Sequence, residues 1–179
     1  EERKVSVDIG KRVKETGIRE LTIQEHTEAQ LYKGETDWAN IGEVKNIRRM
    51  YIPIFGNGDV GSPETAKQMF DKYGVDGIMI GRATYGHPWI FREIKHYLQT
   101  GELLPEPDVN ERVKIARLHF GKSVEVKGEK VGILEMRRHF STYFKGLPNF
   151  KDTRLKLVTS TDPEEIYSLL DFIAENWGK

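Results

Sequence analysis

Two glycine-containing turns directly follow apolar segments of the sequence. Residues 54–59 read IFGNGD, and residues 80–83 read IGRA. Glycine lets the backbone reach positive φ and approach a ligand closely, while Asn57 and Asp59 can hydrogen-bond hydroxyl groups. Past the second segment, backbone N–H groups and the Arg82 guanidinium can bind a phosphate. Either turn alone is also typical of an ordinary tight turn, but the tandem arrangement favours a phosphate-binding site.

Alternating helices and strands surround these turns and must position them. Short β-prone segments at residues 20–24, 51–56 and 78–80 are separated by single helical segments, with starts about 25 to 30 residues apart. Single-helix crossovers imply a parallel sheet. The spacing predicts the last three β/α units of a (β/α)₈ TIM barrel, which in full takes ~250 residues. A small open three-stranded α/β sheet is the alternative, although it would leave both edges unprotected.

The second part of the chain carries only helical signals. A proline-rich acidic stretch at residues 104–108 reads LPEPD and is a plausible linker. Helices are expected at residues 108–126, 131–144, 150–157 and from Asp162 onward, with Asp108 and Asp162 as N-caps. We therefore divide the chain into residues 1–104, a partial barrel, and residues 105–179, a small all-α helical domain.

Basic residues gather in this helical region although the whole chain has a net charge of zero. Residues 111–156 hold twelve Lys or Arg against five Asp or Glu. Arg137, Arg138 and Lys145 fall within little more than two helical turns, and we expect Tyr143 and Phe144 to add aromatic surface for stacking. Such groups suit phosphate contacts and base stacking in RNA. The alternative is a solvated charged face with the aromatic residues in the core.

Composition excludes several classes of site. The chain has no cysteine, which rules out disulfides, thiolate metal sites and a cysteine acid or nucleophile within it, and which fits a cytosolic setting. The histidines are scattered without metal-ligand spacing, so no metal site is expected. No apolar run approaches the ~20 residues needed to cross a membrane.

Residues 51–95 resemble the flavin-phosphate segment of the tRNA-dihydrouridine synthases, in particular the bacterial B-type branch. Upstream, residues 29–34 (AQLYKG) with Asp37 and Trp38 are similar to the loop after that family's sixth barrel strand. Downstream, residues 136–140 (MRRHF) and 143–148 (YFKGLP) resemble the signature of its helical RNA-binding domain. The resemblance extends over essentially the whole chain, in order.

The resemblance implies an FMN-dependent oxidoreductase that uses NADPH to reduce uridine to dihydrouridine in tRNA. FMN would be contacted by two groups of residues at the strand ends, and tRNA by the basic helix. The family's cysteine acid and a flavin-binding lysine would lie before residue 1, so we assign no catalytic residue and expect the isolated chain to be inactive. The residues implied for FMN are Asn57, Gly58, Asp59, Gly81 and Arg82, and those for RNA are Arg137, Arg138 and Lys145.

One motif departs from the family. The family usually reads His-Gly-Arg-Thr at the end of strand 6, where this chain has Gln24, Glu25, His26 and Thr27. The histidine position is thus glutamine, and two new acidic residues, Glu25 and Glu28, lie near a site for phosphate. A non-catalytic tRNA-binding module and another phosphate-binding flavin TIM-barrel enzyme remain the alternatives. The open barrel edges also predict self-association.

Overall fold

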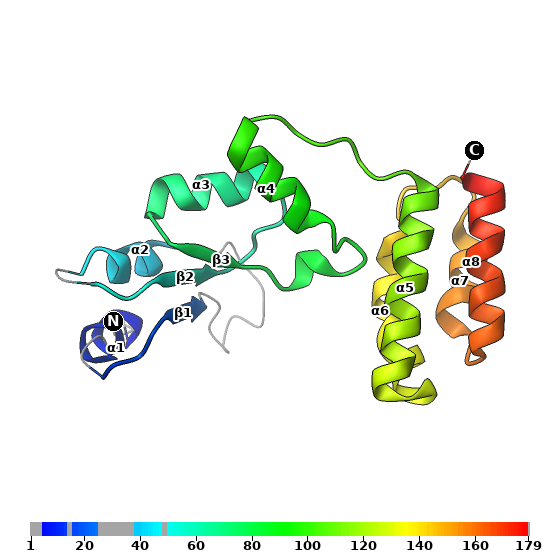
Figure 1. Ribbon diagram of the computed structural model, residues 1–179, viewed down its shortest axis with the longest axis horizontal. Helices are drawn as coiled ribbons and strands as arrows, with labels where there is room; N and C mark the ends of the chain where they lie inside the picture. Colours follow the sequence, from blue (N-terminus) through cyan, green and yellow to red (C-terminus); the bar gives the residue numbers. More distant parts are fainter. Residues whose placement is uncertain (1–4, 14–15, 25–37, 48–49, 179) are drawn as a thin grey trace. The chain divides into compact units, whose positions relative to one another are not determined.

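The computed structural model describes residues 5–13, 16–24, 38–47 and 50–178 (Figure 1). The chain divides into two compact units. The first comprises residues 1–84 and 89–104, and the second comprises residues 85–88 and 105–179. Four residues of the connection after the last strand, 85–88, therefore belong to the second unit. Each unit is described by itself below.

The first unit is built on a three-stranded parallel sheet in the order β1-β2-β3. Each strand is followed by a helix, and successive helices pack against one another from α1 to α4. Figure 1 shows α3 and α4 on the same side of this sheet. The predicted parallel α/β arrangement is confirmed. The elements are α1 (Val5–Val13), β1 (Leu21–Gln24), α2 (Ala39–Lys45), β2 (Ile54–Asn57), α3 (Pro63–Tyr73), β3 (Gly77–Met79), the 3₁₀ turn η2 (Arg82–Thr84) and α4 (Ile90–Thr100).

An apolar core lies between the strands and the helices. Trp38, Ile41 and Val44 project from the start and one face of α2 and are fully buried, as is Ile54 of β2. Ile90, at the start of α4, joins the same cluster. The spacing of Trp38, Ile41 and Val44 places them on one side of the helix, so burial adds to the few backbone hydrogen bonds of this short element.

Helix boundaries follow the local capping chemistry that the sequence predicts. The Ser62 hydroxyl accepts a hydrogen bond from the Thr65 N–H at 3.2 Å, with Pro63 as the first helical residue of α3. The same helix ends at Gly74, whose φ of 65° is left-handed. Both termini therefore satisfy backbone groups that a helix end leaves unpaired.

Strand β2 is shorter at its start than expected. The apolar segment predicted a strand over residues 51–56, but β2 begins at Ile54. Pro53 has no N–H to donate to a neighbouring strand, so regular pairing begins after it. The Pro53 carbonyl still accepts a bond from the Leu21 N–H at 3.0 Å, which sets the register of β1 against β2.

The second unit contains four helices, each packed against two others. Neighbours follow the cycle α5, α6, α7, α8 and back to α5, as in a four-helix bundle. Its core is aromatic, with Phe120 and Phe140 in tilted contact at 5.8 Å between ring centroids. Among the described helices, none is long and apolar enough to cross a membrane. The helices are α5 (Val109–Lys127), α6 (Glu129–Tyr143), α7 (Lys151–Thr159) and α8 (Pro163–Trp177).

Candidate functional site: the strand-end loops and the basic helix

The last residues of the three strands lie side by side. Gln24 of β1 pairs in register with Asn57 of β2, and Asn57 pairs with Met79 of β3. Because the strands are parallel, the connections that follow them leave from the same edge of the sheet. Ligands of open α/β sheets and of barrels bind at this carboxyl edge. The two turns that the sequence singled out are therefore neighbours in space.

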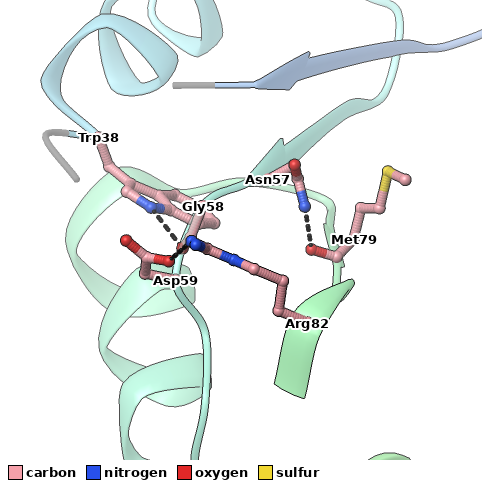
Figure 2. Close-up of polar contacts among 6 residues, drawn as sticks. All are labelled: Trp38, Asn57, Gly58, Asp59, Met79 and Arg82. Atoms are coloured by element: carbon pink, nitrogen blue, oxygen red, sulfur yellow. Dashed lines mark hydrogen bonds and ion pairs between the residues drawn. The ribbon is translucent and has the colours of Figure 1, made fainter. Parts of the chain in front are cut away.

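Two polar contacts join these neighbouring turns (Figure 2). The Asn57 side-chain amide donates to the Met79 carbonyl at 2.8 Å. The Arg82 guanidinium forms an ion pair with the Asp59 carboxylate, and both side chains remain partly exposed, at 48% and 41%. The side chains of Asn57 and Asp59 thus bind the next loop. The sequence indicated that both side chains can bond the hydroxyl groups of a ligand, and it did not indicate these contacts within the protein.

The turn after β2 is also fixed from inside the fold. The indole N–H of Trp38 donates to the Gly58 carbonyl at 3.0 Å, and the Trp38 ring is fully buried. The ring lies so close to Gly56 that a Cβ there would be 2.2 Å from a ring carbon. Asp59, the next residue along the turn, has a left-handed φ of 41°. Such a conformation costs a non-glycine residue about 1–2 kcal/mol, so its surroundings must hold it.

The residues at this edge offer groups that can bind an anion such as a phosphate. Among the described residues, none lies within 4 Å of the position that a Cβ at Gly81 would occupy, which leaves the backbone there accessible from this part of the chain. Arg82 follows at once and opens the 3₁₀ turn η2. A guanidinium carries five N–H donors in a planar fork, so one arginine can bond more than one acceptor at a time. One cation, an open glycine and a polar turn make a donor set suited to a phosphate ester.

The three basic residues expected to bind RNA lie in different settings. Arg138 is exposed; its guanidinium lies over the Tyr85 ring at 5.0 Å and donates to the Tyr85 hydroxyl at 3.0 Å. Arg137 is partly buried and donates to the Thr159 carbonyl at the end of α7, at 3.4 Å. Neighbours on a helix point about 100° apart, which accounts for the difference. Lys145 is exposed just after α6 and borders a surface groove of about 560 Å³.

The family model described as dihydrouridine synthase matches residues 1–176. The chain belongs to the dihydrouridine synthase family. This agrees with the resemblance carried by the two strand-end turns and by the basic helix.

Curated relatives in this family include proteins named tRNA-dihydrouridine synthase B. The one from Salmonella typhimurium is 40% identical over 99% of this chain and 54% of its own length. The one from Pseudomonas putida is 38% identical over 90% of this chain and 47% of its own. A probable tRNA-dihydrouridine synthase from Rickettsia bellii is 36% identical over 87% of this chain and 47% of its own length. The chain thus spans about half the length of the curated relatives it matches.

A cluster of rings in the second unit was not expected from the sequence. His139 of α6 contacts the rings of Tyr85 and His119 at centroid distances of 5.3 and 4.5 Å, and its Nδ1 accepts the Gly86 N–H at 3.4 Å. Burial lowers the pKa of both histidines, and for His139 the nearby His119 and Arg138 lower it further. Burial raises the pKa of Tyr143, which bonds His119 at 3.0 Å, to about 12. The cluster holds residues 85–88 on α6.

Aromatic stacking by Tyr143 and Phe144 was a wrong expectation. Tyr143 is 0% exposed and Phe144 1% exposed, and the two rings lie 6.1 Å apart in the core of the second unit. Their place is explained by the packing of α6 against α5 on one side and α7 on the other. Buried rings cannot stack on a base, so any RNA contact here relies on charge.

Several residues that were compared with the family's motifs lie outside the described part of the chain. They include Glu25, His26, Thr27 and Glu28 of the altered motif, residues 29–34, and Asp37. Gln24 is described, exposed, and placed beside Asn57. Trp38 is also described, and its bond to Gly58 is a contact that sequence reasoning missed. The small residue at position 56 in an otherwise apolar strand was the available signal.

Proposed function

We propose that this chain is the C-terminal part of an FMN-dependent tRNA-dihydrouridine synthase. The observation that supports the proposal most is the ion pair between Asp59 and Arg82, which joins the turns after β2 and β3. Both turns lie at the carboxyl edge of a parallel sheet, in a chain that belongs to the dihydrouridine synthase family. In this proposal residues 1–104 form the last three β/α units of a TIM barrel. Residues 105–179 form the tRNA-binding domain.

The strand-end residues would hold the phosphate end of FMN. Gly81 gives access to the backbone, and Arg82 neutralises the phosphate charge. Asn57, Gly58 and Asp59 shape the adjoining turn and keep Arg82 in place. FMN held here and reduced by NADPH would supply the hydride, which together with a proton would convert uridine in tRNA to dihydrouridine. The task of this chain's residues is to bind and orient.

The basic residues of the second unit would bind the phosphate backbone of folded tRNA. Lys145 and Arg138 are exposed and can reach a phosphate directly. Arg137 contributes charge from a partly buried position and also caps the end of α7. Phosphate contacts of this kind are electrostatic and weaken with salt.

We expect the isolated chain to bind both ligands without turnover. It contains no cysteine, and the family's proton donor to the uracil is a cysteine. Uridine reduction by the 179-residue chain alone would contradict this part of the proposal.

Flavin binding is tested by titrating the chain with FMN and following flavin fluorescence. Arg82→Ala should weaken binding roughly 10- to 100-fold, the equivalent of one charged hydrogen bond. Lys67→Ala removes a comparably exposed cation on α3, paired with Asp71, and should leave the affinity unchanged. Equal affinity in the wild type and in Arg82→Ala would contradict the FMN site.

RNA binding is tested with unmodified tRNA at several salt concentrations. Lys145→Ala should lower affinity at low salt. It should also reduce the slope of log K against log salt by about 0.7–0.9, because the variant neutralises one phosphate fewer. Lys67→Ala again serves as the control. Tight tRNA binding by a chain that takes up no FMN would indicate a non-catalytic tRNA-binding module instead. Absence of tRNA binding at low salt would refute the RNA assignment.

A further inference from the structure

The Trp38 side chain is buried between the sheet and the helices of the first unit. It precedes α2 directly, its ring is fully buried, and it packs against Tyr73 of α3 at a centroid distance of 6.0 Å. Its other side meets Gly56 of β2, where any side chain would overlap the ring. The ring is thus confined on two sides, and its single polar atom faces the Gly58 carbonyl (Figure 2).

Packing alone does not account for this arrangement. A phenylalanine would fill the same apolar space without needing an acceptor, whereas a buried indole N–H must find one. Gly56 lies within β2, and a glycine inside a strand generally weakens the strand because it has no side chain to pack. Both features are explained if the indole is there to hold the carbonyl of Gly58.

Holding that carbonyl fixes the orientation of the next peptide N–H. In a trans peptide the C=O and the following N–H point to opposite sides. With the Gly58 carbonyl directed at the indole, the Asp59 N–H is directed away from the core. The same bond helps to hold the left-handed φ of Asp59, and the Asp59 carboxylate pairs with Arg82 of the next loop.

We propose that Trp38 is a positioning residue for the phosphate site: through Gly58 it orients the Asp59 N–H and the Asp59–Arg82 pair toward the bound anion. This inference rests on the proposed function, because the anion is taken to be the phosphate of FMN. The chain of contacts runs from the indole to Gly58, to Asp59, to Arg82. Trp38 itself does not touch the ligand.

The test is Trp38→Phe, which keeps an aromatic ring and removes the N–H. The affinity for FMN and for inorganic phosphate should fall roughly three- to tenfold, as expected when one hydrogen bond is removed. Trp177→Phe is the matched control, because the Trp177 indole also donates to a backbone carbonyl, that of Pro148 at 2.9 Å, but in the second unit. Trp177→Phe should leave both affinities unchanged.

An amide spectrum distinguishes positioning from general loosening. In the wild type, phosphate should shift the Asp59 amide resonance and slow hydrogen exchange of the Trp38 indole. In Trp38→Phe the Asp59 resonance should move in the free protein and respond less to phosphate. Gly56→Ala, which displaces the ring while retaining the indole, should reproduce both effects. The wild-type exchange measurement stands even if a variant fails to fold.

The outcomes separate the two proposals. A folded Trp38→Phe with wild-type affinity and an unchanged Asp59 resonance overturns the role of Trp38 and leaves the FMN site intact. Fast hydrogen exchange of the Trp38 indole N–H in the wild-type chain would also overturn the role of Trp38 and leave the FMN site intact. Wild-type protein that binds neither phosphate nor FMN overturns both.

Discussion

Substituting Gly86 by alanine tests how residues 85–88 are held on α6. Gly86 has a φ of 64°. A Cβ at this position would lie 2.5 Å from the Tyr143 nitrogen, 2.7 Å from the His139 carbonyl oxygen and 2.7 Å from the Thr142 Cβ. Two of these three atoms belong to the backbone of a helix and cannot turn aside as a side chain does. Gly86→Ala should therefore strain both the loop and the helix.

The loss of stability expected for Gly86→Ala has two parts. A left-handed conformation costs alanine about 1–2 kcal/mol relative to glycine. Forcing a methyl group into a filled space typically costs a further ~1–3 kcal/mol. The free energy of unfolding should thus fall by about 2–5 kcal/mol. Gly146→Ala isolates the first part, because Gly146 has a φ of 94° in the same unit and nothing within 4 Å of its Cβ position.

Urea unfolding of both variants, followed by far-ultraviolet circular dichroism, measures the difference. Gly86→Ala should be destabilised by about 1–3 kcal/mol more than Gly146→Ala. If the loop detaches from α6 instead, the difference will be smaller, and proton contacts between the Tyr85 and His139 rings will disappear from the NMR spectrum. Equal destabilisation by the two substitutions, with the ring contacts retained, would refute the close packing of Gly86.

Three further outcomes are expected. Folding lowers the pKa of His119 and of His139 below the ordinary histidine value of 6.5. Below pH 6.5 these histidines therefore bind more protons in the unfolded chain than in the folded one, so the free energy of unfolding should fall as the pH drops through 6.5. Urea midpoints at several pH values should show this slope, and replacing both histidines by glutamine should flatten it. Phe91→Glu, on an apolar groove of about 360 Å³ beside β3, should reduce concentration-dependent association in sedimentation, whereas Leu118→Glu in the second unit should not. The backbone N–H of the first β2 residue and a lysine hold the Asp76 carboxylate and lower its pKa, so Asp76→Asn should lower the thermal midpoint at pH 7 and have less effect below about pH 3.8.

Local signals in the sequence were sufficient for most element boundaries. The Asp108 side chain accepts from the Glu111 N–H at 2.8 Å, and Asp162 accepts from the Glu164 N–H at 3.0 Å, as capping chemistry predicts. These interactions join residues two or three positions apart. Their geometry follows from the chain itself, which is why spacing alone reveals them.

Contacts between distant residues were not available from spacing. Trp38 and Gly58 are twenty residues apart, and Tyr85 and Arg138 fifty-three. The sequence predicted the glycine-containing turn after β2 but not the indole that bonds it. It predicted a basic helix but not that Arg138 would bind a tyrosine from the connection that follows the last strand. Such pairings depend on how whole elements pack, which no local pattern encodes.

Arg137 and Arg138 show that residues adjacent in a sequence motif can have different surroundings in the fold. The pair was expected to bind RNA as one patch, yet one guanidinium points toward the end of α7 and the other over Tyr85. A cation at a helix C-terminus is stabilising, so replacing Arg137 would disturb α7 as well as any RNA contact. Among the described residues, no hydrogen bond or ion pair of the Lys145 side chain is seen. Substituting Lys145 is therefore the cleaner test of RNA binding.

Gln24, the first residue of the altered motif, lies at the carboxyl edge of the sheet. Register places Gln24 next to Asn57, one strand away from the Asp59–Arg82 pair. The resemblance assigns this position to a histidine, whose imidazole changes charge near pH 6.5, whereas a glutamine amide stays neutral. An amide can still donate a hydrogen bond to a flavin, but it adds no positive charge. Arg82 is then the cation that the described strand ends offer to a phosphate, and phosphate affinity should depend on it at every pH from 5 to 8.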